Sequence, residues 1–348
     1  MSKFRFEEIA INSTEKKKPV ESDKYTYLGL EHLDPGTLKV SRFGSDVAPI
    51  GEKLVMKKGD VLFGKRRAYQ KKVAIAPFDG IFSAHGMVLR PKTEVIDSEF
   101  FPLFISSDYF LDAAIKISVG SLSPTINWKD LKNLEFELPD LETQRQLAKV
   151  LWALIDTIEN YKVLMTKTDE LVKSQFIELF KDCLKQKPLT EICSPKQWKT
   201  IGTKDFTSEG YPVYGANGLI GKYKEFNHDK PTVMIGCRGT CGVIHVSEGK
   251  SYINGNAMCL DDPIPEINYK YLSAALKCYD FSKIITGTSQ PQITIEGLKK
   301  VLVKIPTLEE QKVFISLSEQ SDKSKFELEN CIKNAVSMYK KILKEYLG

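Results

Sequence analysis

Hydrophobic residues recur at helical spacing in two long segments of the chain. Between about 141 and 184 they alternate at spacings of four and three, and neither glycine nor proline interrupts the pattern. This 3.5-residue period is typical of a coiled-coil seam. A second segment, about 308–347, repeats the period, although two serines weaken its middle. We predict two long helices, whose seam positions are Leu147, Leu151, Leu154, Ile158, Tyr161, Met165, Val172, Phe314, Leu317, Leu328, Ala335, Met338 and Ile342.

A short segment of alternating hydrophobic and polar residues precedes each predicted helix. Residues 134–138 and 301–305 alternate in this way, and each segment ends at a proline. Such alternation predicts a half-buried strand. An acidic first turn follows in both cases, which suits the positive end of a helix dipole, and Thr307 with Glu310 fits a capping box.

These strand and helix patterns belong to an internal repeat. With an offset of 167, residues 120–145 align without gaps over 287–312, and nine identities in 26 positions make chance similarity a poor explanation. The preceding stretches repeat more loosely, with Arg66 over Arg238 and His85 over Asn256. We therefore predict an α+β protein of two similar α/β domains separated by long helices, with segments 1–140, 141–184, 185–306 and 307–348.

Composition and charge exclude several classes of protein. A hydrophobic content of 42% and a charged content of 27% favour a folded globular chain over disorder. No apolar run is long enough to span a membrane, and the first residues lack the apolar segment of a signal peptide. The net charge of +5 permits an anionic partner. Seven cysteines without a disulfide framework favour reduced thiols and a cytoplasmic location.

The sequence offers little that resembles catalytic chemistry. Residues 215–223 are similar to a phosphate-binding loop, but the spacing is one residue too long and Tyr223 replaces the metal-binding hydroxyl residue. Cys237 and Cys241 form a close pair without the second pair that a zinc site needs. The four histidines have no nucleophile at a known motif spacing. We therefore expect no catalytic residue, no metal site and no cofactor in this chain.

Two groups of polar residues could contact nucleic acid. The segment 65–72 carries five positive charges with a tyrosine and a glutamine. Arginine can bind guanine through two hydrogen bonds, asparagine or glutamine can bind adenine, and lysine can contact phosphates. A solvated strand end explains the same charges, since lysine-rich edges also protect sheets from aggregation. The candidates in the first domain are Lys65, Arg66, Arg67, Tyr69, Lys71, Lys72 and His85.

The second domain places amides, a hydroxyl and one arginine near glycines. Glycine-bordered turns expose such groups, although asparagine beside glycine is also an ordinary turn signal. Arg238 is the strongest of these candidates. They are Tyr214, Asn217, Arg238, Thr240, Asn254 and Asn256.

Taken together, the motifs resemble a known family. They are Tyr27-Leu-Gly-Leu-Glu-His-Leu33, Gly59-Asp-Val-Leu-Phe-Gly-Lys65, Tyr211-Pro-Val-Tyr-Gly-Ala-Asn-Gly218, Ile235-Gly-Cys-Arg-Gly-Thr-Cys-Gly242, and a proline followed by Leu-Glu-x-Gln at the start of both helices. In this order they resemble the specificity subunit of a type I restriction-modification system, and the resemblance covers essentially the whole chain.

The resemblance implies a noncatalytic DNA reader. Each globular half would be a target recognition domain for one half of a split, asymmetric sequence in double-stranded DNA. The helices would pair antiparallel, with pseudo-twofold symmetry, and set the distance between the half-sites. Two methyltransferase subunits that bind S-adenosylmethionine would dock on this chain, and restriction subunits that use ATP and Mg²⁺ could join them.

Two other functions are compatible with parts of the pattern. A structural adaptor would use its helices and loops to bind protein alone, and it would lack the salt-sensitive affinity for duplex DNA that phosphate contacts produce. An enzyme would show turnover without partner subunits.

Overall fold

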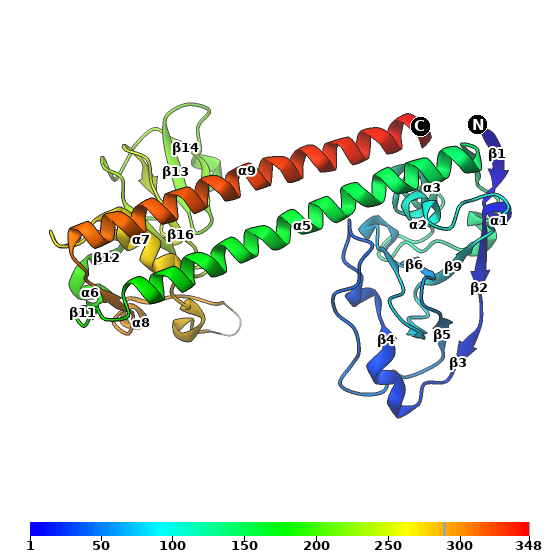
Figure 1. Ribbon diagram of the computed structural model, residues 1–348, viewed down its shortest axis with the longest axis horizontal. Helices are drawn as coiled ribbons and strands as arrows, with labels where there is room; N and C mark the ends of the chain where they lie inside the picture. Colours follow the sequence, from blue (N-terminus) through cyan, green and yellow to red (C-terminus); the bar gives the residue numbers. More distant parts are fainter. Residues whose placement is uncertain (288–289, 348) are drawn as a thin grey trace. The chain divides into compact units, whose positions relative to one another are not determined.

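The computed structural model describes residues 1–287 and 290–347. The chain forms two compact units. Unit 1 contains residues 1–160 and the chain from Cys331 onward, and unit 2 contains residues 161–330. Two helices, α5 (Leu141–Leu179) and α9 (Leu308–Leu347), are each continuous, and each contributes one end to either unit (Figure 1). Within the described residues, no helix has both the length and the apolar character needed to cross a membrane.

Unit 1 is built on two four-stranded sheets and a two-stranded pair. The first sheet is antiparallel, in the order β2 (Ala10–Ser13), β9 (Met87–Pro91), β6 (Val61–Phe63), β7 (Val73–Ile75). The second has the order β3 (Lys16–Lys17), β5 (Lys53–Met56), β8 (Gly80–Phe82), β4 (Tyr27–Leu28), with the last two strands parallel. The pair is β1 (Ser2–Arg5) with β10 (Glu135–Leu138).

Unit 2 repeats the first sheet and the strand pair of unit 1, and its second sheet differs. Its antiparallel sheet has the order β12 (Ser194–Gln197), β18 (Ala257–Asp261), β15 (Val233–Gly236), β16 (Ile244–Val246). A smaller sheet has the order β14 (Gly218–Tyr223), β13 (Tyr211–Gly215), β17 (Tyr252–Ile253), again with a parallel last pair. β11 (Gln186–Pro188) pairs with β19 (Leu302–Lys304). The predicted repeat of two α/β domains with long helices is therefore confirmed.

Short helices complete both units. In unit 1 they are α1 (Phe6–Ile9), α2 (Phe100–Ser106), α3 (Asp108–Lys116) and α4 (Trp128–Leu131), with 3₁₀ turns at Glu21–Thr26, Leu30–His32 and Ala68–Gln70. In unit 2 they are α6 (Leu189–Ile192), α7 (Tyr269–Lys277) and α8 (Ile295–Leu298), with 3₁₀ turns at Thr203–Asp205 and Phe281–Ile284.

Aromatic side chains fill the core of unit 1. The alternation predicted for residues 134–138 puts Phe136 on the buried face of β10, where its ring lies 5.3 Å from Phe104 and 5.4 Å from Phe110. Phe6 lies 5.0 Å from Phe110. Edge contacts of this kind add to the burial of large apolar surface. The core therefore fixes β10, and with it the point where α5 begins.

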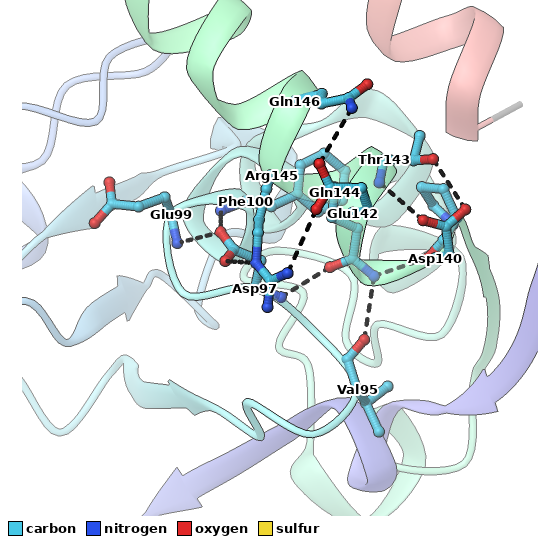
Figure 2. A network of polar contacts seen from close by, with 11 residues as sticks. Val95, Asp97, Glu99, Phe100, Asp140, Glu142, Thr143, Gln144, Arg145 and Gln146 are labelled. Carbon is cyan, nitrogen blue, oxygen red and sulfur yellow. Dashed lines mark hydrogen bonds and ion pairs between the residues drawn. The ribbon is translucent and has the colours of Figure 1, made fainter.

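A buried glutamine attaches the start of α5 to unit 1 (Figure 2). Gln144 is only 1% exposed. Its Oε1 accepts a hydrogen bond from the backbone N–H of Asp97 at 2.8 Å, and its Nε2 donates to the carbonyls of Val95 at 3.1 Å and Pro139 at 2.8 Å. Because all three partners lie outside the helix, this side chain holds the first turn against the globular part of the unit.

Unit 2 contains the same attachment. Gln311, which aligns with Gln144, is fully buried in the first turn of α9. Its Oε1 accepts from the backbone N–H of Asn268 at 2.9 Å, and its Nε2 donates to the carbonyls of Glu266 at 2.7 Å and Pro306 at 3.0 Å. The repeat thus preserves the direction in which each helix leaves its unit.

The predicted capping box is confirmed at α9. The N–H of Thr307 donates to Oε2 of Glu310 at 2.8 Å, and the N–H of Glu310 donates to Oγ1 of Thr307 at 3.3 Å. The hydrogen bond from the Thr307 hydroxyl lowers the pKa of Glu310. At α5 the N–H of Thr143 donates to Asp140, and this backbone bond lowers the pKa of Asp140.

Burial varies among the predicted seam positions, and one of them is exposed. In α5, Leu147 and Leu151 are buried and the other predicted positions are half-buried. In α9, Phe314 is buried and Leu317, Leu328, Ala335 and Ile342 are half-buried. Met338, however, is 55% exposed, and its neighbour Tyr339 packs on the core of unit 1. A straight α-helix drifts from a 3.5-residue repeat, so the strict spacing fails towards the helix end.

The two helices pack beside each other in opposite directions within both units. In unit 1, Leu147 and Leu151 from the start of α5 share a core with Leu343 and Leu347 from the end of α9. In unit 2, Phe176, near the end of α5, lies 5.1 Å from Phe314, near the start of α9. α5 ends at Leu179, not at residue 184, because Phe180 turns into this core and its carbonyl accepts from Lys304 Nζ.

Candidate nucleic-acid interface

An arginine stands at the end of β6 in unit 1, and backbone hydrogen bonds fix its position. The N–H of Arg66 donates to the carbonyl of His85 at 3.2 Å, and Arg66 forms an isolated β-bridge with Thr125. Next to it, the N–H of Ile126 donates to the carbonyl of Lys65 at 2.9 Å. We call residues 64–67 the first arginine turn and residues 119–126 the first proline loop.

The same frame occurs at the end of β15 in unit 2. The N–H of Arg238 donates to the carbonyl of Asn256 at 3.2 Å, and Arg238 forms a β-bridge with Gln292. The N–H of Ile293 donates to the carbonyl of Cys237 at 3.0 Å. Residues 236–239 form the second arginine turn and residues 286–293 the second proline loop. The predicted equivalence of Arg66 with Arg238, and of His85 with Asn256, is therefore confirmed in the structure.

The two proline loops were not among the sequence candidates. Each is closed at its base in the same way, by a bridge between Val119 and Thr125 in unit 1 and between Thr286 and Gln292 in unit 2. Leu122, at the tip of the first loop, is 92% exposed. The equivalent of Leu122 is Ser289, which lies outside the described residues. The repeat itself was the signal that could have assigned these loops to the site.

Positive charge concentrates around the first arginine turn. Arg66 and Arg67 are exposed, and Nη1 of Arg66 lies 3.3 Å from Nε2 of His85. Burial lowers the pKa of His85, and the charges of Arg66, Lys65 and Lys53 lower it further. Burial also lowers the pKa of Lys65, with a smaller effect from the charge of Lys16. The smaller contributions to these shifts come from cations that lie close to His85 and Lys65.

The 3₁₀ turn that follows is bracketed by two strained residues. Arg67 has φ 54° and Lys71 has φ 50°, both in the left-handed region that non-glycine residues seldom adopt. Strain of this kind persists only where the surroundings enforce it. One consequence is that Tyr69 projects outward and is 56% exposed. Tyr69 therefore remains a candidate for stacking on a base or sugar.

Two lysines of this segment have structural roles instead. Nζ of Lys71 lies 2.7 Å from the carboxylates of both Asp108 and Asp112 in α3. Nζ of Lys72 donates to the carbonyl of Leu30 at 2.6 Å. The charge of Lys71 is already neutralised and Lys72 caps a backbone carbonyl, so the prediction that both face a nucleic acid is not supported. Their partners are distant in sequence, which made these roles invisible there.

Two candidates of unit 2 are likewise part of its interior. Tyr214 is 9% exposed, packs in an apolar cluster, and accepts from the N–H of Glu248 through its hydroxyl. Asn254 is 3% exposed, and its amide is occupied by the backbone N–H and carbonyl of Ile201. Neither side chain can reach a ligand without unfolding its surroundings. Both predictions are corrected.

The remaining candidates of unit 2 gather around Arg238. Asn217, Arg238, Thr240 and Asn256 are all exposed. Asn217 lies in the turn between β13 and β14, and this turn packs on Gly236, where any Cβ would collide with the carbonyl oxygens of Ala216 and Thr240. A glycine is therefore required at this crossing. The backbone thus presents two amides, one hydroxyl and one guanidinium on neighbouring turns.

The close cysteine pair of unit 2 is engaged by backbone carbonyls. Sγ of Cys237 lies 3.2 Å from the carbonyl of Asn256, and Sγ of Cys241 lies 3.1 Å from the carbonyl of Pro291. Burial raises the pKa of both thiols. Thiols held protonated in this way pack as small apolar groups.

Comparison with known proteins places this architecture in a family. The family model described as "Type I restriction modification DNA specificity domain" matches residues 6–166 and 183–338. The chain is 29% identical over 161 residues to the EcoDI specificity subunit of Escherichia coli, a match covering 45% of this chain and 36% of that protein. It is 24% identical over 343 residues to the MjaVIII specificity subunit of Methanocaldococcus jannaschii, covering 83% and 77%.

A solved structure agrees with the fold. The S subunit of a type I restriction-modification system from M. genitalium matches with a TM-score of 0.60 and 18% identity, covering 100% of this chain and 96% of that one. The matched part spans about a third of the EcoDI subunit. The two family matches cover most of this chain, one for each copy of the repeat. The chain therefore belongs to the family of type I restriction-modification DNA specificity domains.

Proposed function

We propose that this chain reads a split DNA sequence, with each unit contacting one half-site. The observation that carries the proposal is the repeated frame of arginine turn and proline loop, which the two units build with equivalent backbone bonds and fill with different side chains. Two domains that recognise different DNA sequences can share the same backbone frame but need different side chains on it. The target is therefore asymmetric.

The chemistry of each frame suits duplex DNA. An exposed arginine can bind the O6 and N7 atoms of guanine through two hydrogen bonds, and exposed amides can bind adenine. In unit 1 the cations Lys65 and Arg67 flank Arg66, so phosphate contacts and base contacts lie together. In unit 2 the neighbours of Arg238 are uncharged polar residues, namely Asn217, Thr240 and Gln292. We infer that unit 1 supplies more phosphate binding and unit 2 more base discrimination.

Leu122 gives unit 1 a further means of recognition. An exposed apolar side chain among cations can press against the bases of a groove or enter a base step, as apolar wedges do in proteins that bend DNA. The aligned stretch of the second loop, Thr288-Ser-Gln-Pro-Gln292, has four polar residues and a proline, and it has a serine where the first loop has Leu122. The two half-sites should therefore differ in how far the DNA is deformed as well as in sequence.

In this proposal the chain performs no chemistry of its own. Two methyltransferase subunits would dock on the chain and bind S-adenosylmethionine for adenine N6-methylation. Restriction subunits would bind ATP and Mg²⁺. The continuous helices α5 and α9 would set the distance between half-sites, because their length is fixed by about 1.5 Å per residue.

Methylation mapping tests the function as a whole. N6-methyladenine is mapped by long-read sequencing in cells that carry the partner methyltransferase with and without this chain. We expect a split, asymmetric motif that is present only with the chain. An identical methylation pattern in both strains would contradict the proposal, provided that the chain co-purifies with the methyltransferase. Such a result would favour an adaptor that binds protein alone.

A further inference from the structure

Three potential metal ligands converge in unit 2, away from the arginine turn. Nε2 of His228, Sγ of Cys259 and a carboxylate oxygen of Asp261 all lie within 4.8 Å of one another. Cys259 and Asp261 are two residues apart on β18 and therefore face the same side of the sheet. His228 comes from the segment before β15, where its backbone bonds to Ser251.

A neighbouring asparagine fixes the orientation of the imidazole. The amide of Asn227 is itself fixed, because Ile253 donates its N–H to Oδ1 at 2.8 Å and accepts from Nδ2 at 3.0 Å. Oδ1 of Asn227 therefore accepts, and it lies 2.7 Å from Nδ1 of His228. The proton of a neutral ring must then be on Nδ1, which leaves the lone pair of Nε2 directed at its other neighbour.

The other neighbour of Nε2 is a carboxylate, so a positive charge between the two groups would be favourable. Nε2 of His228 lies 3.1 Å from Oδ1 of Asp261. Two lone pairs facing each other at this distance repel, and either a proton or a metal ion between them removes the repulsion. The thiol of Cys259 lies beside this pair and favours the metal ion over the proton, since a proton shared by nitrogen and oxygen needs no sulfur ligand.

The donor set is the one that zinc prefers. Imidazole nitrogen, thiolate sulfur and carboxylate oxygen are all common zinc ligands, and sulfur disfavours Mg²⁺ and Ca²⁺. A ligating histidine usually donates its other N–H to a carbonyl or carboxylate, which is the role of Asn227 here. The Asp261 side chain is 20% exposed, so water can reach the fourth position.

We propose that His228, Cys259 and Asp261 bind a Zn²⁺ ion. Zn²⁺ would take the thiolate of Cys259 and release its proton to solvent, while His228 binds through Nε2 without losing a proton. Because the thiol must lose its proton to bind the ion, the uptake of zinc should weaken as the pH falls. The ion would join β18 to the segment before β15 and, through Asn227 and Ile253, to β17. It would thus link the two sheets of unit 2.

The proposal is independent of DNA reading and has its own test. The full chain is purified, stripped with chelator and titrated with Zn²⁺ against a chromophoric competitor, and its metal content is measured by mass spectrometry. A parallel titration with Co²⁺ reports a thiolate-to-cobalt absorption band. The variants are Cys259→Ala, Asp261→Asn and Asn227→Ala. Cys193→Ala is the matched control, because Cys193 is a buried cysteine of the same unit that lies close enough to Asp261 to sense its charge but does not belong to the ligand cluster.

The wild-type chain and Cys193→Ala should bind one tightly held Zn²⁺ and show the cobalt band. Cys259→Ala should lose the band, and Asp261→Asn, which preserves shape, should lose tight binding while remaining folded by circular dichroism. Asn227→Ala should weaken binding by ~10–100-fold, because it removes the contact that orients His228, along with two hydrogen bonds to the backbone of Ile253. No stoichiometric ion in the wild type, or equal binding by the wild type and Asp261→Asn, would overturn the proposal and leave a proton between His228 and Asp261.

Discussion

Gln144 in unit 1 and Gln311 in unit 2 each make the same three kinds of hydrogen bond. By contrast, one equivalent position on the central strands β9 and β18 holds a cation in unit 1 and an anion in unit 2. Arg90 of β9 forms two hydrogen bonds with the carboxylate of Asp60, at 2.7 and 2.9 Å. Asp261, at the same position of β18, faces His228. Duplication has kept the contacts that orient the helices and has changed those inside the sheets. The parts of the fold that set geometry are therefore separable from the parts that set chemistry.

The largest expected effect comes from altering the geometry shared by both units. Four residues inserted into α5 alone, between Leu154 and Val172, should abolish methylation, because they shift the seam of one helix relative to the other. Seven residues inserted into both helices preserve the heptad and add about 10 Å. That variant should methylate a motif with about three more base pairs between the half-sites, at about 3.4 Å each. A motif with unchanged spacing would show that the helices do not set it.

Removing a glutamine attachment should cost stability equally in the two units. Gln144→Ala removes the side-chain partner of one N–H and two carbonyls, and Gln311→Ala does the same. We expect each change to lower the free energy of unfolding in urea by roughly 2–5 kcal/mol. Gln146→Ala is the control, because Gln146 is exposed and bonds only to Glu142. Equal stability of Gln144→Ala and Gln146→Ala would refute the attachment.

Smaller effects are expected at the arginines, where the units differ. In the complex with methyltransferase, Arg66→Ala should weaken DNA binding by ~1–3 kcal/mol at one half-site, and Arg238→Ala should do so at the other. Arg66→Lys keeps the charge and loses the paired hydrogen bonds, so it separates base from phosphate contact. Arg66→Lys could bind DNA as tightly as the wild type, while Arg66→Ala loses the same affinity for every sequence. Arg66 would then contact a phosphate and not a base.

The smallest effect concerns a half-buried histidine of unit 2, His245. Burial lowers the pKa of His245, with a further contribution from Lys277, and its Nε2 has no hydrogen-bond partner. A pKa lower in the folded than in the unfolded chain means that the unfolded chain binds more protons. This contribution to stability is therefore complete above pH 6.5, the ordinary pKa of a histidine side chain, and is lost as the pH falls from there through the lower pKa of the folded chain. His245→Gln should flatten this decline between pH 7 and 5 in thermal melts, and an unchanged pH dependence would contradict the assignment.

The elements within the internal repeat could be predicted from the sequence. The roles of side chains that depend on contacts with residues distant in sequence could not. The offset of 167 predicted the strand and the helix start in both copies, because local pattern determines them, and it aligned Gln144 with Gln311 without indicating that either is buried. Tyr214 and Asn254 looked like readers because their turns are rich in glycine, and only the packing of unit 2 shows that they are buried. Lys71 looked like a free cation until α3 supplied Asp108 and Asp112.

Two further features needed the third dimension. Leu122 lies in a segment with no distinctive chemistry, and its meaning comes from the bridge between Arg66 and Thr125 that brings the loop to the arginine turn. His228 is separated by many residues from Cys259 and Asp261, and no motif spacing joins them. Backbone topology, which places sequence-distant turns side by side, decides both cases.

The most direct test of the central claim is to map N6-methyladenine in cells that express Arg66→Ala or Arg238→Ala with the partner methyltransferase. If the two units recognise DNA independently, each variant should relax the sequence specificity of one half of the split motif, and the affected half should differ between the variants. The spacing and the other half should be unchanged. Loss of both half-sites in either variant, or the same altered half in both, would contradict the account.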